Sequence, residues 1–228
     1  MQCVAFPSPV LPGKEESPAK FGQELSGNPG LADFVARSGI GILRVFQMNT
    51  PQGAVVTTYM EAESLASAFD LQQNDTSEVA RLLRQQIMDA HGMDITTAPA
   101  PAAEQWLEHY EPHTPRQPGL GFSVPVVPGK TGPLRGLWSE ITGSRRDEWQ
   151  AFNSSLGASV HRAFVLETPM GDFASVYFEA TDPVAANAAF AADTSAFGLH
   201  FKSVVEEAFG IDFGDPLPPI TQLFEVTG

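Results

Sequence analysis

The sequence predicts an α+β fold in which one unit, ordered β-α-β-β-α-β, occurs twice in tandem. The main observation is an internal repeat: residues 39–94 align with residues 157–212 without a gap. Most of the identical positions form the same short motifs in both copies: Thr-Pro-x-Gly, Tyr-x-Glu-Ala, Asp-Thr-Ser and Gly-x-Asp. A second observation is that strand-like and helical patterns follow in the same order around both copies. A repeat this long indicates the architecture before any single residue is interpreted.

Each copy opens with a strand, a turn and a helix. The apolar runs at 1–6 and 121–127 lie at matching places, and Pro-Gly-Lys follows both. The pattern predicts a helix from about Ser17 to Ser38, broken near Asn28, and its partner from about Leu134 to Leu156.

A β-hairpin comes next in each copy. In its turn, Thr-Pro-x-Gly, proline at the second position and glycine at the fourth favour a tight connection. The turns are Thr50–Gly53 and Thr168–Gly171. The strands are expected at 40–49 and 54–62 in the first copy, and at 158–167 and 172–180 in the second.

A pair of helices and a last strand complete each copy. Ser64 and Asp182 are good N-caps, Asp-Thr-Ser predicts a second helix start, and Gly92 and Gly210 are natural helix ends. The last strands are expected at 105–110 and 223–226. Each copy then has the ferredoxin-like order. We therefore expect ferredoxin-like unit 1 at 1–110, an extended Pro-rich linker at 111–119, and ferredoxin-like unit 2 at 120–228.

An antiparallel sheet with its helices on one side leaves its other face bare, and two copies in one chain can cover each other. The motifs and their order resemble the dimeric α/β-barrel superfamily, and within it a bacterial family of unknown function. The resemblance covers nearly the whole chain and implies two sheets paired into an intramolecular barrel. Relatives in the superfamily include cofactor-independent monooxygenases, isomerases, cyclases, haem enzymes and proteins without known activity. Fold analogy alone does not choose among them.

The hairpin register places three polar residue types on one sheet face. If the turn closes at Thr and Gly, each arginine lies opposite a tyrosine and is the diagonal neighbour of a glutamate. The opposed pairs are Arg44 with Tyr59, Ile42 with Glu61, Arg162 with Tyr177, and Val160 with Glu179. The other face is smaller and more apolar, so we assign it to the helices. An odd loop length would slip the pairing and exchange the faces.

The face with arginine, tyrosine and glutamate is the candidate ligand-binding site. Its members are Arg44, Phe46, Tyr59 and Glu61 in the first copy, and Arg162, Phe164, Tyr177 and Glu179 in the second. Arg44–Glu61 and Arg162–Glu179 can be structural ion pairs, or they can bind a polar or anionic ligand group. A tyrosine hydroxyl beside arginine can donate to a developing oxyanion. The best catalytic candidates are Arg162, Tyr177 and His161.

The histidines differ between the copies, because His161 stands where the first copy has Leu43, and His200 where it has Leu82. Such asymmetry fits a duplicated protein that keeps one working site, although a core histidine is the simpler interpretation of His200. No metal site and no cofactor are predicted. Haem is the alternative, with His200 as its axial ligand.

The composition argues against some classes of binding partner and indicates a cellular compartment. The net charge of -14 argues against nucleic acid and anionic membrane surfaces as partners. The single cysteine, Cys3, excludes an intrachain disulfide and fits a reducing compartment. No apolar run is long enough for a transmembrane helix. We expect a cytoplasmic protein that is monomeric by internal pseudo-dimerisation, or a homodimer of that monomer.

These observations predict a soluble protein that binds a small hydrophobic or aromatic molecule in an apolar pocket with a polar end. If it is an enzyme, we expect metal-free oxygenation, isomerisation or cyclisation. Arginine would orient the substrate oxygen, tyrosine would stabilise an enolate-like anion, and glutamate would hold the arginine. The alternative is a non-catalytic binding or structural protein whose barrel is filled by its own side chains.

Overall fold

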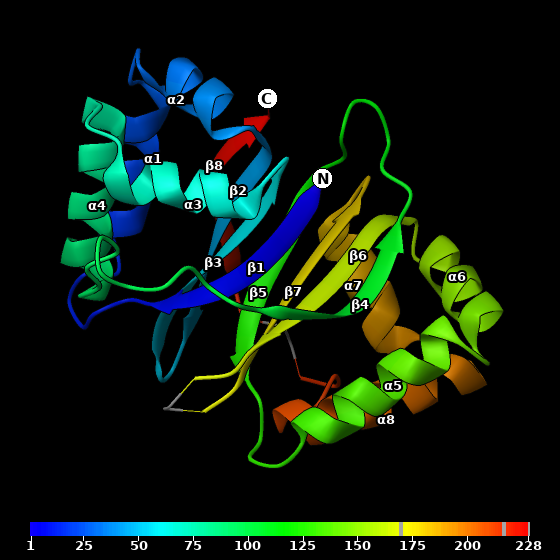
Figure 1. The fold of residues 1–228 in the computed structure, drawn as a ribbon. Helices are drawn as coiled ribbons and strands as arrows, with labels where there is room; N and C mark the ends of the chain where they lie inside the picture. Colours follow the sequence, from blue (N-terminus) through cyan, green and yellow to red (C-terminus); the bar gives the residue numbers. More distant parts are fainter. Residues whose placement is uncertain (169–170, 216–217, 228) are drawn as a thin grey trace. The chain divides into compact units, whose positions relative to one another are not determined.

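The computed structural model describes residues 1–168, 171–215 and 218–227 and consists of two α+β units. Unit 1 comprises Met1–Ala102 and Pro219–Gly228, and unit 2 comprises Ala103–Pro218. Each unit holds one four-stranded antiparallel sheet and four helices in its described residues (Figure 1). The predicted α+β class and the tandem β-α-β-β-α-β arrangement are confirmed.

The sheet of unit 1 has the strand order β1-β3-β2-β8. Its strands are β1 (Gln2–Pro9), β2 (Ile40–Thr50), β3 (Gly53–Ala62) and β8 (Ile220–Thr227). Its helices are α1 (Ser17–Ser26), α2 (Leu31–Ser38), α3 (Leu65–Asn74) and α4 (Glu78–His91). The break predicted near Asn28 therefore separates α1 from α2.

The sheet of unit 2 has the equivalent order β5-β7-β6-β4. Its strands are β4 (Glu104–Tyr110), β5 (Gly119–Pro125), β6 (Ala158–Leu166) and β7 (Phe173–Ala180). Its helices are α5 (Thr131–Thr142), α6 (Arg146–Ser155), α7 (Pro183–Ala192) and α8 (Ala196–Phe209). The first helical region is interrupted here too, so both repeats follow the same plan.

The fourth strand of each sheet comes from the other sequence repeat. Strand β4 ends the first repeat but pairs with β6 in unit 2, and β8 ends the second repeat but pairs with β2 in unit 1. The expected units 1–110 and 120–228 are corrected accordingly, and the expected linker 111–119 belongs to unit 2. A sequence pattern predicts that a strand exists, but any exposed sheet edge offers the same backbone donors and acceptors. Tertiary contacts therefore decide which sheet edge the last strand of a repeat joins.

The predicted hairpin register is confirmed in both units. Arg44 lies opposite Tyr59 in unit 1, and Arg162 lies opposite Tyr177 in unit 2. In the first turn the Thr50 hydroxyl donates to the Gly53 carbonyl at 2.9 Å, and that glycine has a φ of 128°, which a side chain would disfavour. In the second turn Thr168 and Gly171 make the same contact, while Pro169 and Met170 lie outside the described residues.

The apolar sheet faces pack against the helices, as the pattern predicts. In unit 1, Leu43 and Val45 of β2 contact a core formed by residues of α1, α2 and α4. In unit 2 the helices contribute a cluster of aromatic rings, in which Trp149 of α6 stacks on Phe201 of α8 with centroids 5.5 Å apart. The face with arginine, tyrosine and glutamate is consequently the one opposite the helices.

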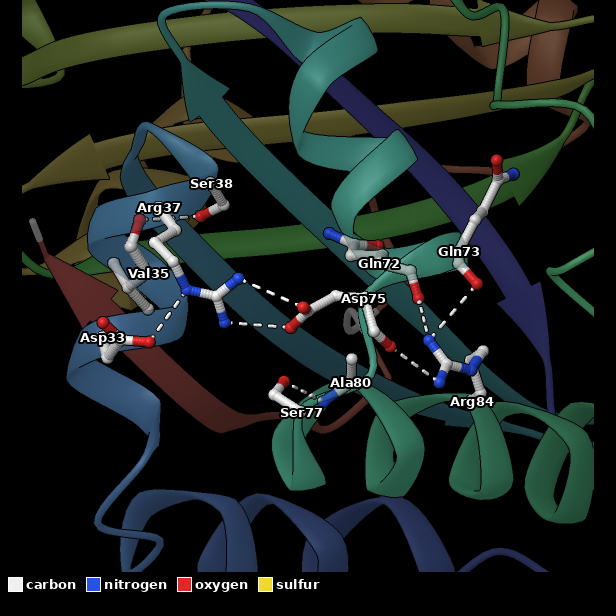
Figure 2. A network of polar contacts seen from close by, with 10 residues as sticks. All are labelled: Asp33, Val35, Arg37, Ser38, Gln72, Gln73, Asp75, Ser77, Ala80 and Arg84. Atoms are coloured by element: carbon white, nitrogen blue, oxygen red, sulfur yellow. Dashed lines mark hydrogen bonds and ion pairs between the residues drawn. The ribbon is translucent and has the colours of Figure 1, made fainter.

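The repeated Asp-Thr-Ser motif connects two helices in each unit. Ser77 accepts the Ala80 amide at 3.3 Å and caps α4, and Ser195 caps α8 in the same way. In unit 1 the Asp75 carboxylate also receives two hydrogen bonds from Arg37 of α2 (Figure 2). The Arg37 guanidinium holds the pKa of this carboxyl well below its usual range. The motif is therefore a structural element of the repeat.

In both units, a cationic side chain on one helix caps the C-terminal end of the helix before it. Arg84 of α4 and Lys202 of α8 occupy equivalent positions, and both donate to carbonyls at the end of the helix before (Figure 2 shows Arg84). The acceptors are the carbonyls of Gln72, Gln73 and Asp75 in unit 1, and of Ala191 and Asp193 in unit 2. Cations near helix C-termini satisfy carbonyls that have no partner within the helix.

In the described part of the chain, every helix is too short or too polar to cross a membrane.

Candidate functional site

The site residues of unit 2 converge on the sheet face opposite the helices. Arg162 lies on β6, and Tyr177 and Glu179 lie on the neighbouring strand β7. All three side chains are buried, and Glu179 is 0% exposed. A buried carboxylate is stable only when charged or polar donors surround it. Its partners therefore define the chemistry of the site.

Glu179 accepts hydrogen bonds from an arginine and a tyrosine. Arg116, from the loop between β4 and β5, donates from Nε at 2.9 Å and from Nη2 at 2.6 Å. The Tyr177 hydroxyl donates to Oε1 of the same carboxylate. Charge-assisted bonds of this two-point type fix both position and orientation. Glu179 is thus firmly held within unit 2.

Arg162 contacts two side chains of the exchanged strand β4. Its Nε and Nη2 donate to Oε1 of Glu108 at 3.1 and 2.9 Å. Its guanidinium carbon lies 3.9 Å from the centre of the Tyr110 ring, within the range of a cation–π contact. The guanidinium of Arg116 approaches the same ring at 5.8 Å. Two cations, two carboxylates and two phenol rings therefore form one connected group.

The sequence predicts the convergence but not these partners. The sequence pairs Arg162 with Glu179, and the structure adds the carboxylate of Glu108 beside Arg162 and the guanidinium of Arg116 beside Glu179. Glu108 could have been found, because Glu225 occupies the equivalent place beside Arg44. Arg116 lies in the loop before the repeat begins, so no repeated position marks it.

Unit 1 repeats the plan with its own arginine, tyrosine and glutamates. Arg44 donates to Glu225 of β8 at 2.8 Å, and the Tyr59 hydroxyl donates to Glu61 at 2.6 Å. Phe46 and Phe164 are buried at equivalent positions of the two units. The strand registers align Thr227 with Tyr110, so the aromatic ring against Arg162 is a feature of unit 2. This asymmetry distinguishes the two candidate sites.

His161 does not converge with Arg162 and Tyr177. Its ring lies on the helix side of β6, 5.1 Å from the Trp149 ring. The Asn153 amide nitrogen donates to the Trp149 carbonyl, so its oxygen is the acceptor that faces Nδ1 of His161 at 2.9 Å. Burial, and then the nearby His109, lower the pKa of His161 to about 3. His161 is thus a neutral core side chain.

The low pKa of His161 predicts that the folded protein loses stability in acid. A folded pKa of about 3, against 6.5 ordinarily, means that the unfolded chain takes up a proton first as pH falls. Stability is therefore complete above pH 6.5 and declines towards pH 3. Because part of the side chain is exposed to solvent, we expect a loss of about 2 kcal/mol between pH 6.5 and 4.5.

The test compares the wild-type protein with His161→Leu, which installs the residue that the first repeat has at Leu43. Urea unfolding at pH 7 and pH 4.5 should show a smaller stability loss in the variant than in the wild type. Equal losses in both proteins would contradict a neutral, buried His161.

His200, the candidate axial ligand in the haem alternative, contacts Glu140 of α5 through Nε2 at 2.8 Å. It lies on α8, among helices that cover the opposite face of the sheet. In the described ranges, no three His, Cys, Asp or Glu side chains gather in a way that could hold a metal ion. The site group described above contains no histidine.

A surface hollow of about 660 Å³ lies elsewhere in unit 1, between α1 and the β2–β3 hairpin. It is lined by side chains such as Glu15, Lys20 and Gln47. Gln47 lies on the helix-facing side of β2, so the hollow and the Arg44 side chain belong to opposite faces of the sheet. None of the predicted site residues lines it.

Comparisons with known proteins define the class of fold. The chain is similar to the crystal structure of a protein from Fusobacterium nucleatum described as a "putative monooxygenase", with a TM-score of 0.51 at 6% identity. That match covers 99% of this chain and 93% of the other. A protein from Lactobacillus acidophilus with the same description has a TM-score of 0.50 at 8% identity, over 100% and 97% of the two chains. At this identity the likeness shows the fold alone.

No protein-family model matches the sequence, and the search of curated proteins found no match.

Proposed function

We propose that the protein binds a small hydrophobic or aromatic molecule with an oxygen-bearing end, and that unit 2 holds the working site. The observation that most supports this proposal is the group formed by Arg116, Arg162, Tyr110 and Tyr177 around two carboxylates. Unit 1 has a threonine in place of the ring that stacks on the arginine. The proposal includes membership of the dimeric α/β-barrel superfamily, supported by the fold and its whole-chain neighbours.

The proposed reaction class is metal-free oxygenation, isomerisation or cyclisation. Arg162 would orient the oxygen of the bound molecule, and Tyr110 would offer its ring to an aromatic body. Tyr177 would donate a hydrogen bond to negative charge developing on that oxygen. The hydroxyl has one proton, which it donates to Glu179 in the free protein, so it would turn to the ligand oxygen in this step while Arg116 keeps Glu179 in place.

A second candidate function is a non-catalytic protein, and one observation favours it. Each charged group of the site already has a partner within unit 2. Such mutual pairing is typical of structural ion pairs, which can specify a fold without binding a ligand. The two functions differ in what happens when an arginine is replaced.

Replacing Arg162 by methionine should abolish ligand binding while the protein stays folded. The fold should survive because Glu108, the carboxylate left behind, is partly hydrated at 41% side-chain exposure. The measurement is native mass spectrometry of the purified protein for a co-purifying ligand, together with thermal unfolding. Arg44→Met in unit 1 is the matched control and should retain the ligand.

Three results would contradict the proposal. A ligand retained by Arg162→Met but lost from Arg44→Met would move the site to unit 1. An unfolded Arg162→Met protein would favour the structural function. Wild-type protein that carries no small molecule, and binds none from a library of aromatic metabolites, would favour a non-catalytic fold.

A further inference from the structure

The surface hollow between α1 and the β2–β3 hairpin is a second candidate binding site, and its lining residues all belong to unit 1. Its volume of about 660 Å³ lies within the range of small-molecule sites. The wall includes carboxylates, an ammonium group and amides, which come from Glu15, Glu16, Lys20, Gln47 and Asn49. Such a wall suits a small ligand that carries charge and forms hydrogen bonds.

Gln47 supplies a buried acceptor at this hollow. The residue lines the hollow and is only 7% exposed. Its Nε2 donates to the Glu15 carbonyl and to Oδ1 of Asn49, both at 3.0 Å. Because a backbone carbonyl can only accept, the contact with Glu15 fixes which end of the amide is the nitrogen. The oxygen, Oε1, is buried and has no hydrogen-bond donor among the residues that the structure describes, which costs free energy.

The second repeat shows that the fold does not require this glutamine. The gap-free alignment pairs Gln47 with Val165, which is 3% exposed on the helix side of β6. An apolar side chain therefore fills the same position of the same fold. Gln47 instead brings a polar group with an unsatisfied acceptor into a helix-facing position of unit 1. We conclude that packing alone does not explain it.

Two more differences between the repeats lie beside the hollow. In unit 2 the Thr131 hydroxyl, at the start of α5, donates to the Asp172 carboxylate before β7 at 2.6 Å. Pro-Gly-Lys precedes both Thr131 and Glu15, so these two residues correspond, and the alignment pairs Asp172 with Ala54. Alanine offers no side-chain acceptor, so unit 1 lacks this link between helix and hairpin. Glu15 and Ala54 line the hollow instead.

Glu15 gives the hollow a net negative charge. Its Oε1 accepts the Gly13 amide at 3.0 Å. Hydrogen bonds from its own backbone amide, and then from that of Gly13, hold its pKa below the ordinary value. Among the residues that the structure describes, Glu15 has no cationic partner, whereas Glu16 is paired with Lys20 at 2.8 Å. The hollow thus combines one unbalanced carboxylate with one unsatisfied acceptor.

We infer that the hollow binds a small organic ammonium ion. One N–H of the ammonium donates to Oε1 of Gln47, and its positive charge lies beside the Glu15 carboxylate. Oε1 lies just below the surface, so neighbouring side chains must turn aside to admit the ligand. Lys20 and Asn49 are exposed, and exposed side chains change rotamer readily. The site is in unit 1 and is independent of the proposed function.

The charge and the available ligands favour an ammonium ion over an anion or a metal ion. The protein has a net charge of -14, which attracts cations and repels anions. A metal ion would need several carboxylates or histidines together, and the described ranges contain no such group of three. A single positive charge balances the single unpaired carboxylate.

The experiment titrates the ¹⁵N-labelled full-length protein with butylammonium, tetramethylammonium and butanol, and follows the backbone amides by NMR. Butylammonium should shift the amides of residues 15–20 and of the hairpin. Tetramethylammonium carries the same charge without an N–H and should bind about tenfold more weakly. Butanol, which carries no charge, should not shift these amides measurably.

Three variants test the two contacts. Gln47→Val, which installs the residue of the second repeat, should weaken butylammonium about tenfold and remove its advantage over tetramethylammonium. Its thermal stability should stay equal or rise, because the unsatisfied acceptor is gone. Glu15→Gln should weaken both cations about fivefold. Glu24→Gln, on α1 but outside the lining, removes the same charge and should change neither.

Unchanged butylammonium affinity in a folded Gln47→Val protein would overturn the inference. Tetramethylammonium that binds as tightly as butylammonium, or butylammonium that shows no saturable binding, would overturn it too. Calcium that displaces butylammonium at a lower concentration would identify a metal site instead. If Gln47→Val does not fold, equal losses for Glu15→Gln and Glu24→Gln would refute the site. All of these outcomes leave the unit 2 site untouched, so the two proposals fail separately.

Discussion

Replacing Arg116 by methionine is expected to destabilise the protein by about 3–5 kcal/mol, because it breaks a buried ion pair by removing one partner. Glu179 is 0% exposed and receives two hydrogen bonds from this guanidinium at 2.9 and 2.6 Å. The Tyr177 hydroxyl would remain as a donor to the carboxylate, but it carries no charge. The measurement is the free energy of unfolding in urea at neutral pH.

A double variant separates the loss of the pair from the loss of packing. Arg116→Met combined with Glu179→Gln removes both charges and keeps an acceptor for the Tyr177 hydroxyl. We expect it to recover most of the stability lost in the single variant, because replacing both members of a buried pair by neutral groups costs much less. A double variant as unstable as Arg116→Met alone would contradict this electrostatic explanation.

Arg135→Met serves as the exposed control. Arg135 contacts Glu104 and Glu167 in the same unit, but 46% of its side chain is accessible to solvent. Exposed ion pairs are weak, so the expected change in unfolding free energy is below about 1 kcal/mol. Similar losses for Arg116→Met and Arg135→Met would show that burial of Glu179 does not govern stability.

The local structure of the repeat could be predicted because its signals are short-range. The Thr-Pro-x-Gly turn gives the hairpin loop an even length, and this sets the register of the two strands. The register alone places Arg44 beside Tyr59 and Arg162 beside Tyr177. The same argument puts His161 on the helix side, although its polar ring made it a catalytic candidate. Residue type was a poorer guide than register for this histidine.

Long-range pairing could not be predicted from the same signals. Strand β4 is recognisable in the sequence, yet hydrogen bonding to β6 depends on backbone groups that every strand shares. The counter-ion of Arg162 follows from that pairing, since Glu108 is on β4. Arg116 is harder still, because a loop side chain reaches Glu179 only when the chain path around it is known.

The strand exchange predicts that structural units and sequence repeats behave differently as fragments. A fragment spanning Ala103–Pro218 contains a complete four-stranded sheet with α5 to α8, and should unfold cooperatively. The second sequence repeat, residues 120–228, lacks β4 and retains β8, whose partner β2 is absent. We expect this repeat to remain largely unfolded, because an edge strand, the counter-ion of Arg162 and the counter-ion of the buried Glu179 are missing.

The two fragments keep the same helices, so their difference tests the exchanged strand and the loop that follows it. Residues 103–119 supply Glu108 for Arg162 and Arg116 for Glu179, two buried groups that otherwise lose charged partners. Thermal unfolding followed by circular dichroism should show a sharp transition only for Ala103–Pro218. A fragment of residues 120–228 with an equally sharp transition at the same temperature would show that β4 contributes little to the folding of this sheet.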